Sequence, residues 1–280
     1  MSQEPNNENG KSSIEASYAH SGSAAAPAFF SARTAEKQAG FLLPHLSSGM
    51  SVIDCGCGPG SITAGLANIV APGEVIGIDI DPKQIELAGD LNNKQGLRNV
   101  RFETQSIYDL PFADNSFDAA FSNAVLSHLQ TPLAAVKEIY RIVKPGGVVG
   151  IRLLDAGGDL LSPSDPLLAK FLELYYQLVD HHGGDTLIAR HQRKLMRQAG
   201  FSRIQVSATC EYYSTLEATR HWGQTIAAVL QEEEFANQII EATDANRELL
   251  VDVSKAWQNW SENPDAFFSQ VWCQAIGWVD

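Results

Sequence analysis

The stretch Val52-Ile53-Asp54-Cys55-Gly56-Cys57-Gly58-Pro59-Gly60 decides the fold of this 280-residue chain. Its apolar start predicts a buried parallel strand, and the glycines at every second position predict a turn that opens the next helix. A helix N-terminus offers free backbone N–H groups and a partial positive charge. Glycine also lets the backbone approach a ligand closely. The stretch therefore predicts a binding site for a small ligand directly after the first strand.

Strand-like and helix-like segments alternate along the chain. Apolar runs typical of buried strands occur at 52–54, 74–80, 100–104, 116–122 and 148–154. Stretches that predict helices lie between them at 61–70, 82–95 and 131–143. Later segments predict a strand at 204–213 and either a helix or a strand at 267–279. Such alternation predicts an α/β fold with a doubly wound, mostly parallel sheet.

The chain also divides by composition. Residues 1–13 are polar and predict a disordered tail, whereas 14–280 predict a single domain that starts with a helical segment. Within that domain, 33–154 would form the core. Residues 155–191 contain glycine and proline breaks around an apolar stretch and predict an inserted helical cap. The remaining residues, 192–280, are expected to form further strands and helices.

Composition limits the classes of partner. With 33 acidic and 20 basic residues the net charge is −13, which disfavours nucleic acid and anionic membranes as partners. The start of the chain lacks the apolar region of a signal peptide, and no apolar run approaches the roughly 18 residues of a membrane span. The four cysteines lack zinc spacing and fit free thiols in a reducing compartment. We therefore expect a cytoplasmic protein that acts on a small molecule, and a homodimer stays open.

The spacing of the glycines and the acid before them distinguish two kinds of ligand. Dinucleotide enzymes hold a pyrophosphate with G-x-G-x-x-G, but here Ser61 stands at the third glycine position. Asp54 lies immediately before the first glycine of the turn, and its carboxylate would repel a pyrophosphate and attract an ammonium group. This combination favours S-adenosylmethionine (SAM) over NAD.

A second acid follows the next predicted strand, in Ile76-Gly77-Ile78-Asp79-Ile80-Asp81. An acid at the end of the second strand suits the two ribose hydroxyls of an adenosine cofactor. Asp79 is the better candidate, because Asp81 followed by Pro82 fits the N-cap of the next helix.

In order and spacing, the motifs of this chain resemble those of class I SAM-dependent methyltransferases. The resemblance covers 51–154 and includes Asp109-Leu110-Pro111-Phe112, Asp114-Asn115-Ser116-Phe117-Asp118 and Val143-Lys144-Pro145-Gly146-Gly147. The flanking segments 33–36 and 272–278 resemble small-molecule methyltransferases of the ubiquinone/menaquinone and secondary-metabolite type. The resemblance implies a seven-stranded, Rossmann-like sheet. It also implies transfer of a methyl group from SAM to an O, N or C atom of a small, apolar metabolite.

The resemblance implies roles for residues of the two acidic motifs. The glycines of the turn would face the methionyl and ribose part of SAM: Gly56, Gly58 and Gly60. Asp54 would orient the amino group, directly or through water. Asp79 would hold the ribose hydroxyls, and Ile80 would pack on the adenine.

Further cofactor contacts are implied outside these motifs. Ser106 and Ile107 stand where many relatives carry an acid that bonds the adenine, so a hydroxyl or backbone contact would substitute. Asn123 would place backbone beside the sulfonium. From the N-terminal segment, Tyr18 and Arg33 would fold over the cofactor, and Arg33 would pair with its carboxylate or else form a surface salt bridge.

Three histidines are candidates for a base that takes a proton from the methyl acceptor. His128 follows the fourth predicted strand at a position that faces the active site in similar enzymes, and a structural histidine is the equal alternative. His181 and His182 lie in a stretch, 180–185, that predicts either a hinged loop lining the acceptor pocket or a solvated polar loop. The spacing of this stretch does not fit a metal site, so no metal ligand is predicted.

Two alternatives to a methyltransferase remain. A SAM-binding protein without transfer activity, such as a cyclase or a structural partner, would carry the same cofactor motifs. A dinucleotide oxidoreductase is disfavoured by Asp54 before the glycines and by Ser61 after them.

Overall fold

Seven strands form one sheet in the computed structural model, which describes residues 33–280. The strand order is β3-β2-β1-β4-β5-β7-β6. β7 runs antiparallel to both of its neighbours, β5 and β6, and all other adjacent pairs are parallel. The predicted doubly wound, mostly parallel sheet is thus confirmed. Tyr18 and the predicted tail lie outside the described residues. The strands are β1 (Val52–Cys55), β2 (Val75–Asp79), β3 (Val100–Thr104), β4 (Phe117–Asn123), β5 (Val143–Ser162), β6 (Arg203–Tyr213) and β7 (Phe267–Trp278).

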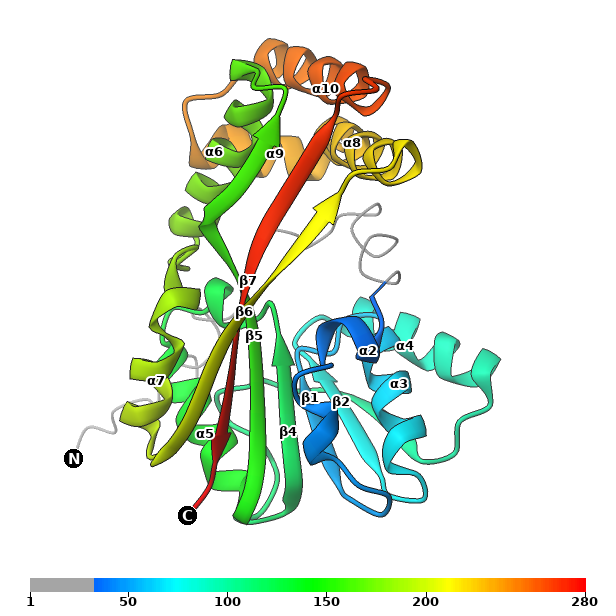
Figure 1. The fold of residues 1–280 in the computed structure, drawn as a ribbon, viewed down its shortest axis with the longest axis vertical. Helices are drawn as coiled ribbons and strands as arrows, with labels where there is room; N and C mark the ends of the chain where they lie inside the picture. The colour runs from blue at the N-terminus through cyan, green and yellow to red at the C-terminus, as the bar shows by residue number, and fades with distance from the viewer. Residues whose placement is uncertain (1–32) are drawn as a thin grey trace, which may run out of the picture.

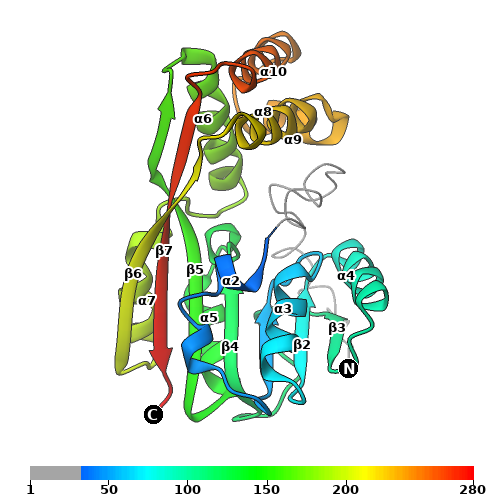
Figure 2. The ribbon, with the colours of Figure 1, turned by 45° about the vertical axis from the view of Figure 1, so that its right-hand side comes forward.

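Helices cover both faces of the sheet (Figures 1 and 2). On one face lie α2 (Ala35–Gln38), α3 (Ser61–Val70) and α4 (Pro82–Gln95). On the other face lie α5 (Pro132–Ile142) and α7 (Gln192–Ala199). The carboxyl ends of the parallel strands all point toward the upper part of the molecule in Figure 1. In open α/β sheets, ligands bind at this edge.

Alternation along β1 assigns its side chains to the two faces. Ile53 and Cys55 pack in the core beneath α5 and α7, whereas Val52 packs in the core beneath α2 and α3. Asp54 therefore points to the same face as Val52. There Thr63 of α3 donates a hydrogen bond to the Asp54 carboxylate at 2.6 Å.

β5, β6 and β7 are much longer than the other strands and continue upward past the carboxyl ends of β1, β2 and β4 (Figure 1). β5 continues past Leu154, where the sequence pattern predicted its end, because pairing with β7 resumes after a shift of register between Asp155 and Leu160. The two consecutive glycines at 157–158 lie within this shift of register and do not break the strand. The segment 267–279, for which helix and strand were both open, forms β7.

A second hydrophobic core lies above the sheet, among helices that we call the helical cap. The cap consists of α6 (Pro166–His181), α8 (Leu216–Gln231), α9 (Glu233–Ala242) and α10 (Arg247–Ser261). The predicted cap segment thus supplies α6, and three later helices pack with it. Trp257 is fully buried at the centre, in edge contact with Phe171, Trp260 and Phe268. The Trp260 indole N–H donates to the Ser162 carbonyl at 3.0 Å and ties α10 to the end of β5.

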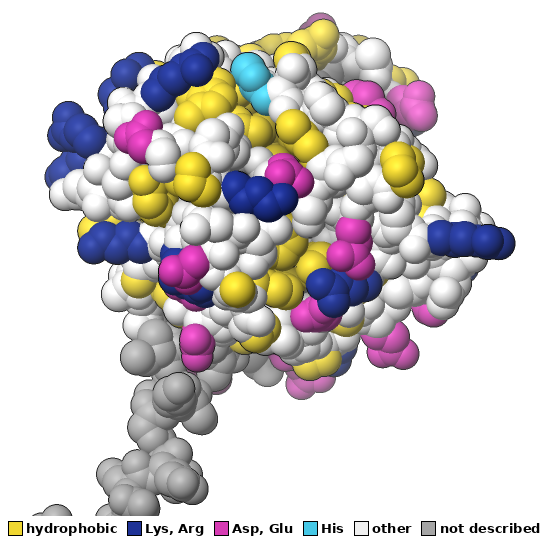
Figure 3. Space-filling model, turned by 90° about the horizontal axis from the view of Figure 1, so that it is seen from below, with side chains coloured by type: hydrophobic (Ala, Val, Ile, Leu, Met, Phe, Trp, Pro, Cys, Tyr) yellow, Lys and Arg dark blue, Asp and Glu magenta, His cyan; other side chains and the backbone are white. Residues whose placement is uncertain are grey.

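The lower face of the molecule, opposite the cap, mixes both signs of charge with scattered hydrophobic side chains (Figure 3). Basic side chains gather toward the upper left of this face in the figure, and both signs are interspersed over the rest of it. Among residues 33–280, no helix is both long and apolar enough to cross a membrane.

Candidate active site

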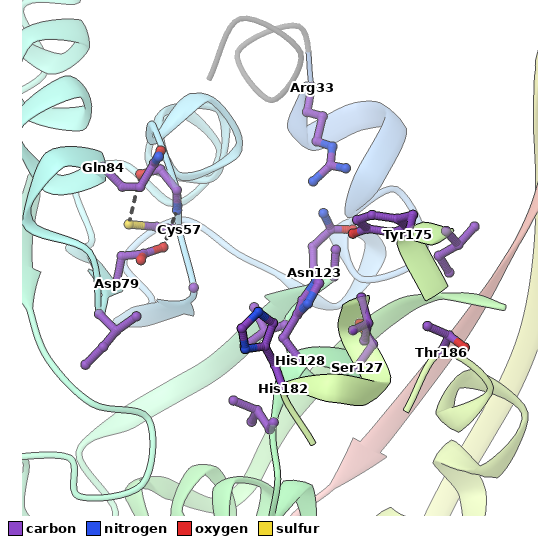
Figure 4. Close-up of a pocket in the computed structure, with 18 of the residues that line it drawn as sticks. Arg33, Cys57, Asp79, Gln84, Asn123, Ser127, His128, Tyr175, His182 and Thr186 are labelled. Carbon is purple, nitrogen blue, oxygen red and sulfur yellow. Dashed lines mark hydrogen bonds between the residues drawn. The ribbon is translucent and has the colours of Figure 1, made fainter. Parts of the chain in front are cut away.

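A cavity of about 330 Å³ lies between the carboxyl edge of the sheet and the helical cap. Figure 4 shows its arrangement: Cys57, Asp79 and Gln84 lie at one end, and Tyr175 and Thr186 lie at the other. His128 and Asn123 lie between the two ends. The first end is built from the loops after β1, β2 and β3, and the second from the cap. The cavity therefore joins the predicted cofactor site to a largely apolar chamber.

The glycine turn after β1 forms the floor of the first end. Gly58 has a positive φ of 53° and lines the cavity. The atom nearest to a Cβ placed on Gly58 would be the Gln84 amide oxygen, at 3.9 Å. That oxygen is itself buried without a hydrogen-bond partner among the described residues. The turn thus leaves an open cradle with an acceptor atom available to a ligand.

Gly56 and Gly60 are glycines for different reasons. A Cβ on Gly56 would lie 2.1 Å from the Val125 methyl, in a turn whose backbone already has φ of 80°. A Cβ on Gly60 would lie 2.8 Å from the Phe102 ring and 2.9 Å from Ala88. Gly56 lines the cavity, but Gly60 is not among the described lining residues. Gly60 therefore serves the packing of α3 against α4 and β3.

Replacing Gly56 with alanine should destabilise the protein by at least about 1 kcal/mol more than replacing Gly96. Both positions have positive φ, which costs about 1–2 kcal/mol for alanine, but no atom lies within 4 Å of a Cβ on Gly96. The extra cost at Gly56 comes from overpacking against Val125, which typically amounts to about 1–3 kcal/mol. Urea denaturation of both variants measures the difference, and equal losses would mean that the Val125 contact relaxes freely.

Asp79 ends β2 and lines the cavity. Its two carboxylate oxygens accept hydrogen bonds from the Gly58 N–H at 2.9 Å and the Asp81 N–H at 3.0 Å, which fix its orientation. Burial raises the pKa of Asp79, and those two N–H donors oppose the rise. Asp81 accepts from the Lys83 N–H at 2.9 Å and caps α4, as its position before Pro82 predicted. The structure thus separates a cavity acid from a capping acid.

Asp54 lies beneath the turn and is not among the described residues that line the cavity. It is 2% exposed, and burial raises its pKa to about 7, with the Thr63 hydrogen bond opposing the rise and the charge of Asp79 adding to it. Any effect of Asp54 on a ligand therefore acts across the turn, as a buried negative charge or through a bridging group.

The other predicted cofactor residues also line the cavity. Ile80, Ser106 and Ile107 line the cavity, as does Asn123 at the end of β4. Ile80 is 40% exposed, which is unusual for a large apolar side chain beside a cavity and leaves its surface open for contact. Next to Asn123, Ala124 has a positive φ of 60°, a strained conformation for alanine that turns the chain sharply at the cavity.

Arg33 and a buried arginine from β5 enclose a tryptophan on the cavity wall. Trp272 carries the Arg152 guanidinium over its ring at 3.9 Å and that of Arg33 at 5.6 Å. Arg152 is 1% exposed, pairs with Glu211 at 2.6 Å and donates to the Asn123 side chain at 3.2 Å. Burial lowers the pKa of Arg152 to about 10 and also lowers that of Arg33. No local sequence pattern marks this cluster, because its members lie far apart in the chain.

The three candidate histidines separate in space. His128, in a short helical turn (Leu126–His128), and His182, at the end of α6, both line the cavity, whereas His181 is not among its described lining residues. The loop after α6 is held against that turn by the Asp185 N–H, which donates to the Ser127 carbonyl at 2.9 Å. Burial lowers the pKa of His128 to about 4, with the charges of Arg33 and His182 adding to the effect. His128 is therefore neutral at physiological pH.

The chamber at the cap end is lined by one face each of two helices. His182 follows directly after α6, and the lining residues of the helix itself recur at helical spacing: Phe171, Leu172, Tyr175, Tyr176 and Val179. Those of α8 do likewise: Trp222, Thr225, Ile226 and Val229. The sequence carried this signal as amphipathic periodicity, but the same pattern also fits a packed core, so it did not reveal a chamber. Within residues 33–280, histidines, cysteines and acids do not gather into a group that could hold a metal ion.

Comparisons with known proteins agree with this architecture. A family model described as a methyltransferase domain matches residues 53–151. An uncharacterized methyltransferase of Schizosaccharomyces pombe, C1B3.06c, is 31% identical over 245 residues, which cover 84% of this chain and 87% of that protein. The O-methyltransferase cnsE of Penicillium expansum is 31% identical, with 66% of this chain and 68% of that protein covered. The YcgJ protein of Bacillus subtilis shares the fold, with a TM-score of 0.57, 20% identity and coverage of 86% and 97%. The chain therefore belongs to the methyltransferase family.

Proposed function

We propose that the protein transfers the methyl group of SAM to a small, largely apolar metabolite. The observation that carries the proposal is the single cavity in which an adenosine-type cradle opens into an apolar chamber. When bound, SAM supplies a methyl group on a positively charged sulfur. The similarity to cnsE, which is named an O-methyltransferase, favours oxygen as the atom that is methylated.

The residues of the cradle fit the chemistry of SAM. The Asp79 carboxylate offers acceptor lone pairs to a pair of ribose hydroxyls, and the open space over Gly58 lets a ligand approach the backbone. The Gln84 amide oxygen adds an unused acceptor. The negative charge of Asp54 favours an ammonium group, and the cation of Arg33 favours a carboxylate on the same ligand.

His128 is suited to accept a proton from a hydroxyl of the acceptor. It lies between the two ends of the cavity, and above about pH 4 its imidazole is neutral, which is the form that can accept a proton. The apolar walls of the cap would hold the acceptor close to the methyl donor and exclude water, so alignment supplies much of the rate.

Calorimetric titration tests the cofactor. SAM and S-adenosylhomocysteine should bind, and NAD should not. A screen of small phenols and other hydroxylated metabolites for S-adenosylhomocysteine formation then tests transfer. NAD binding without SAM binding would overturn the proposal, and SAM binding without any product would favour a protein of this fold that has lost transfer.

Replacing His128 with glutamine should lower kcat by roughly 10- to 50-fold at saturating SAM. A positioned general base typically raises the reaction rate by about 10²–10⁴-fold. A base with a low pKa is weak, so its contribution to the rate falls at or below the lower end of that range. Because the lowered pKa of His128 keeps it neutral, kcat of the wild type should stay level from neutral pH down to about 5 and fall as pH approaches 4. The matched control is His45→Gln, since His45 contacts Trp278 away from the cavity. Full turnover by His128→Gln would remove His128 from the mechanism.

A further inference from the structure

One partly buried acid that the proposed transfer does not use lies directly behind a lining residue of the apolar chamber. Asp159 lies in the extended part of β5 and accepts a short hydrogen bond from the Tyr176 hydroxyl of α6. Burial raises the pKa of Asp159 to about 6, while Tyr176 and Gln270 lower it and the charge of Asp155 adds to the rise. At neutral pH the group is therefore mainly a carboxylate.

This carboxylate fixes the direction of the Tyr176 hydroxyl. A phenol has one proton to donate and lone pairs that accept. Tyr176 gives its proton to one oxygen of Asp159, and both Tyr176 and Gln270 line the cavity. The second oxygen of Asp159 is buried and makes no hydrogen bond of normal geometry within residues 33–280, although Gln270 lies close enough to lower the pKa. The cluster is thus rich in acceptors, and the Tyr176 oxygen can only accept from a ligand.

The position of Tyr176 along α6 sets a distance to the histidine end of the chamber. Tyr176 lies in α6 and His182 directly follows that helix; both line the cavity, and their separation of six residues corresponds to about 9 Å along a helix axis. Two aromatic side chains, Tyr175 and Trp222, line the space with them. A flat molecule of about two fused rings matches such a span.

We propose that Tyr176, oriented by Asp159, recognises a second hydroxyl on the methyl acceptor, at the end of the molecule away from the methylated atom. The acceptor class is then a fused-ring or bicyclic phenol with hydroxyl groups at opposite ends. This inference rests on the proposed function, which places an acceptor in the chamber. It assigns specificity to Tyr176 and a positioning role to Asp159.

Equilibrium dialysis of the full chain with saturating S-adenosylhomocysteine tests the proposal with two probes of the same shape. In 2,6-dihydroxynaphthalene both ends donate hydrogen bonds, whereas 2,6-dimethylnaphthalene presents methyl groups of similar size. A neutral hydrogen bond contributes about 0.5–1.5 kcal/mol to binding, so Tyr176→Phe should lower the affinity for the diol by about 3- to 10-fold. The same variant should leave the dimethyl probe unchanged.

Two further variants separate recognition from a loss of structure. Tyr212→Phe removes the hydroxyl of a tyrosine that is 66% exposed on β6 and should change neither probe. Asp159→Asn replaces the carboxylate with an amide whose NH2 group can donate to the Tyr176 oxygen and compete with the ligand, so it should weaken binding of the diol without affecting the dimethyl probe. The proposal is overturned if the diol does not bind the wild type, or if Tyr176→Phe weakens neither probe or both equally. Failure of S-adenosylhomocysteine to bind in the same dialysis cells would instead count against the proposed function.

Discussion

Replacing Asp54 with asparagine should stabilise the ligand-free protein at about pH 8 by about 2–4 kcal/mol, and it should weaken SAM binding at the same time. The stabilisation arises because Asp54 is buried beside Thr63 and must ionise there without water. Asparagine keeps an oxygen that can accept from Thr63 but carries no charge. The weakening arises because the ammonium group of SAM loses a nearby negative charge.

The pH dependence of Asp54 follows from the direction of its pKa shift. The pKa rises from 3.8 in the unfolded chain to about 7 in the folded protein, so the folded state holds a proton that the unfolded state releases between these values. Stability is therefore greatest below about pH 4 with respect to this group, and it falls as pH rises to about 7. The advantage of Asp54→Asn should shrink accordingly from pH 8 to pH 5.

Urea denaturation at both pH values measures this effect, and calorimetry measures SAM affinity. Asp90→Asn, on the exposed surface of α4, is the matched control and should change neither quantity appreciably. A destabilised Asp54→Asn protein at pH 8 would mean that the carboxylate is compensated in the ligand-free state. Unchanged SAM affinity would mean that Asp54 does not act across the turn.

Replacing Asp79 with alanine should weaken SAM binding by two to three orders of magnitude. Hydrogen bonds to a charged group contribute about 1.5–3 kcal/mol each, and the carboxylate is positioned to accept from two ribose hydroxyls. Alanine also removes the acceptor for the Gly58 N–H, which orders the turn. Both losses act on binding in the same direction.

The neighbouring acid supplies the control for Asp79. Asp81→Asn removes the same charge two residues away and keeps a side chain that can cap α4, so SAM affinity should stay within about threefold. Calorimetric titration of both variants with SAM gives the comparison. Equal losses of SAM affinity in the Asp79 and Asp81 variants would point to general electrostatic attraction instead of a specific contact by Asp79.

Local sequence patterns carried the cofactor half of the site. An apolar run, an acid and spaced glycines form a strand and a turn through short-range geometry, and Asp79 follows from the end of the next strand. Because parallel strands in one sheet end at a common edge, residues after β1, β2, β3 and β4 meet without any information from distant parts of the chain. The parallel sheet and the placement of Ile80, Ser106, Ile107 and Asn123 in one cavity were predictable for this reason.

The acceptor half depends on contacts between residues distant in sequence. Arg152 meets Glu211 and Trp272 only through the pairing of β5, β6 and β7, and Asp159 meets Tyr176 only because β5 continues beyond the glycines at 157–158. Amphipathic periodicity in α6 and α8 marked a buried face, but it did not distinguish a packed core from a chamber.

The sequence by itself therefore determined the sheet and the residues of the proposed cofactor cradle, because these depend on strand and turn geometry along short stretches of chain. Only the tertiary structure decided that Gly60 serves packing and that His128 and His182 share a cavity while His181 does not line it. It also placed Asp159 against Tyr176, which lines the apolar chamber. Burial and long-range pairing set these properties, and both arise only when the strands and helices pack together.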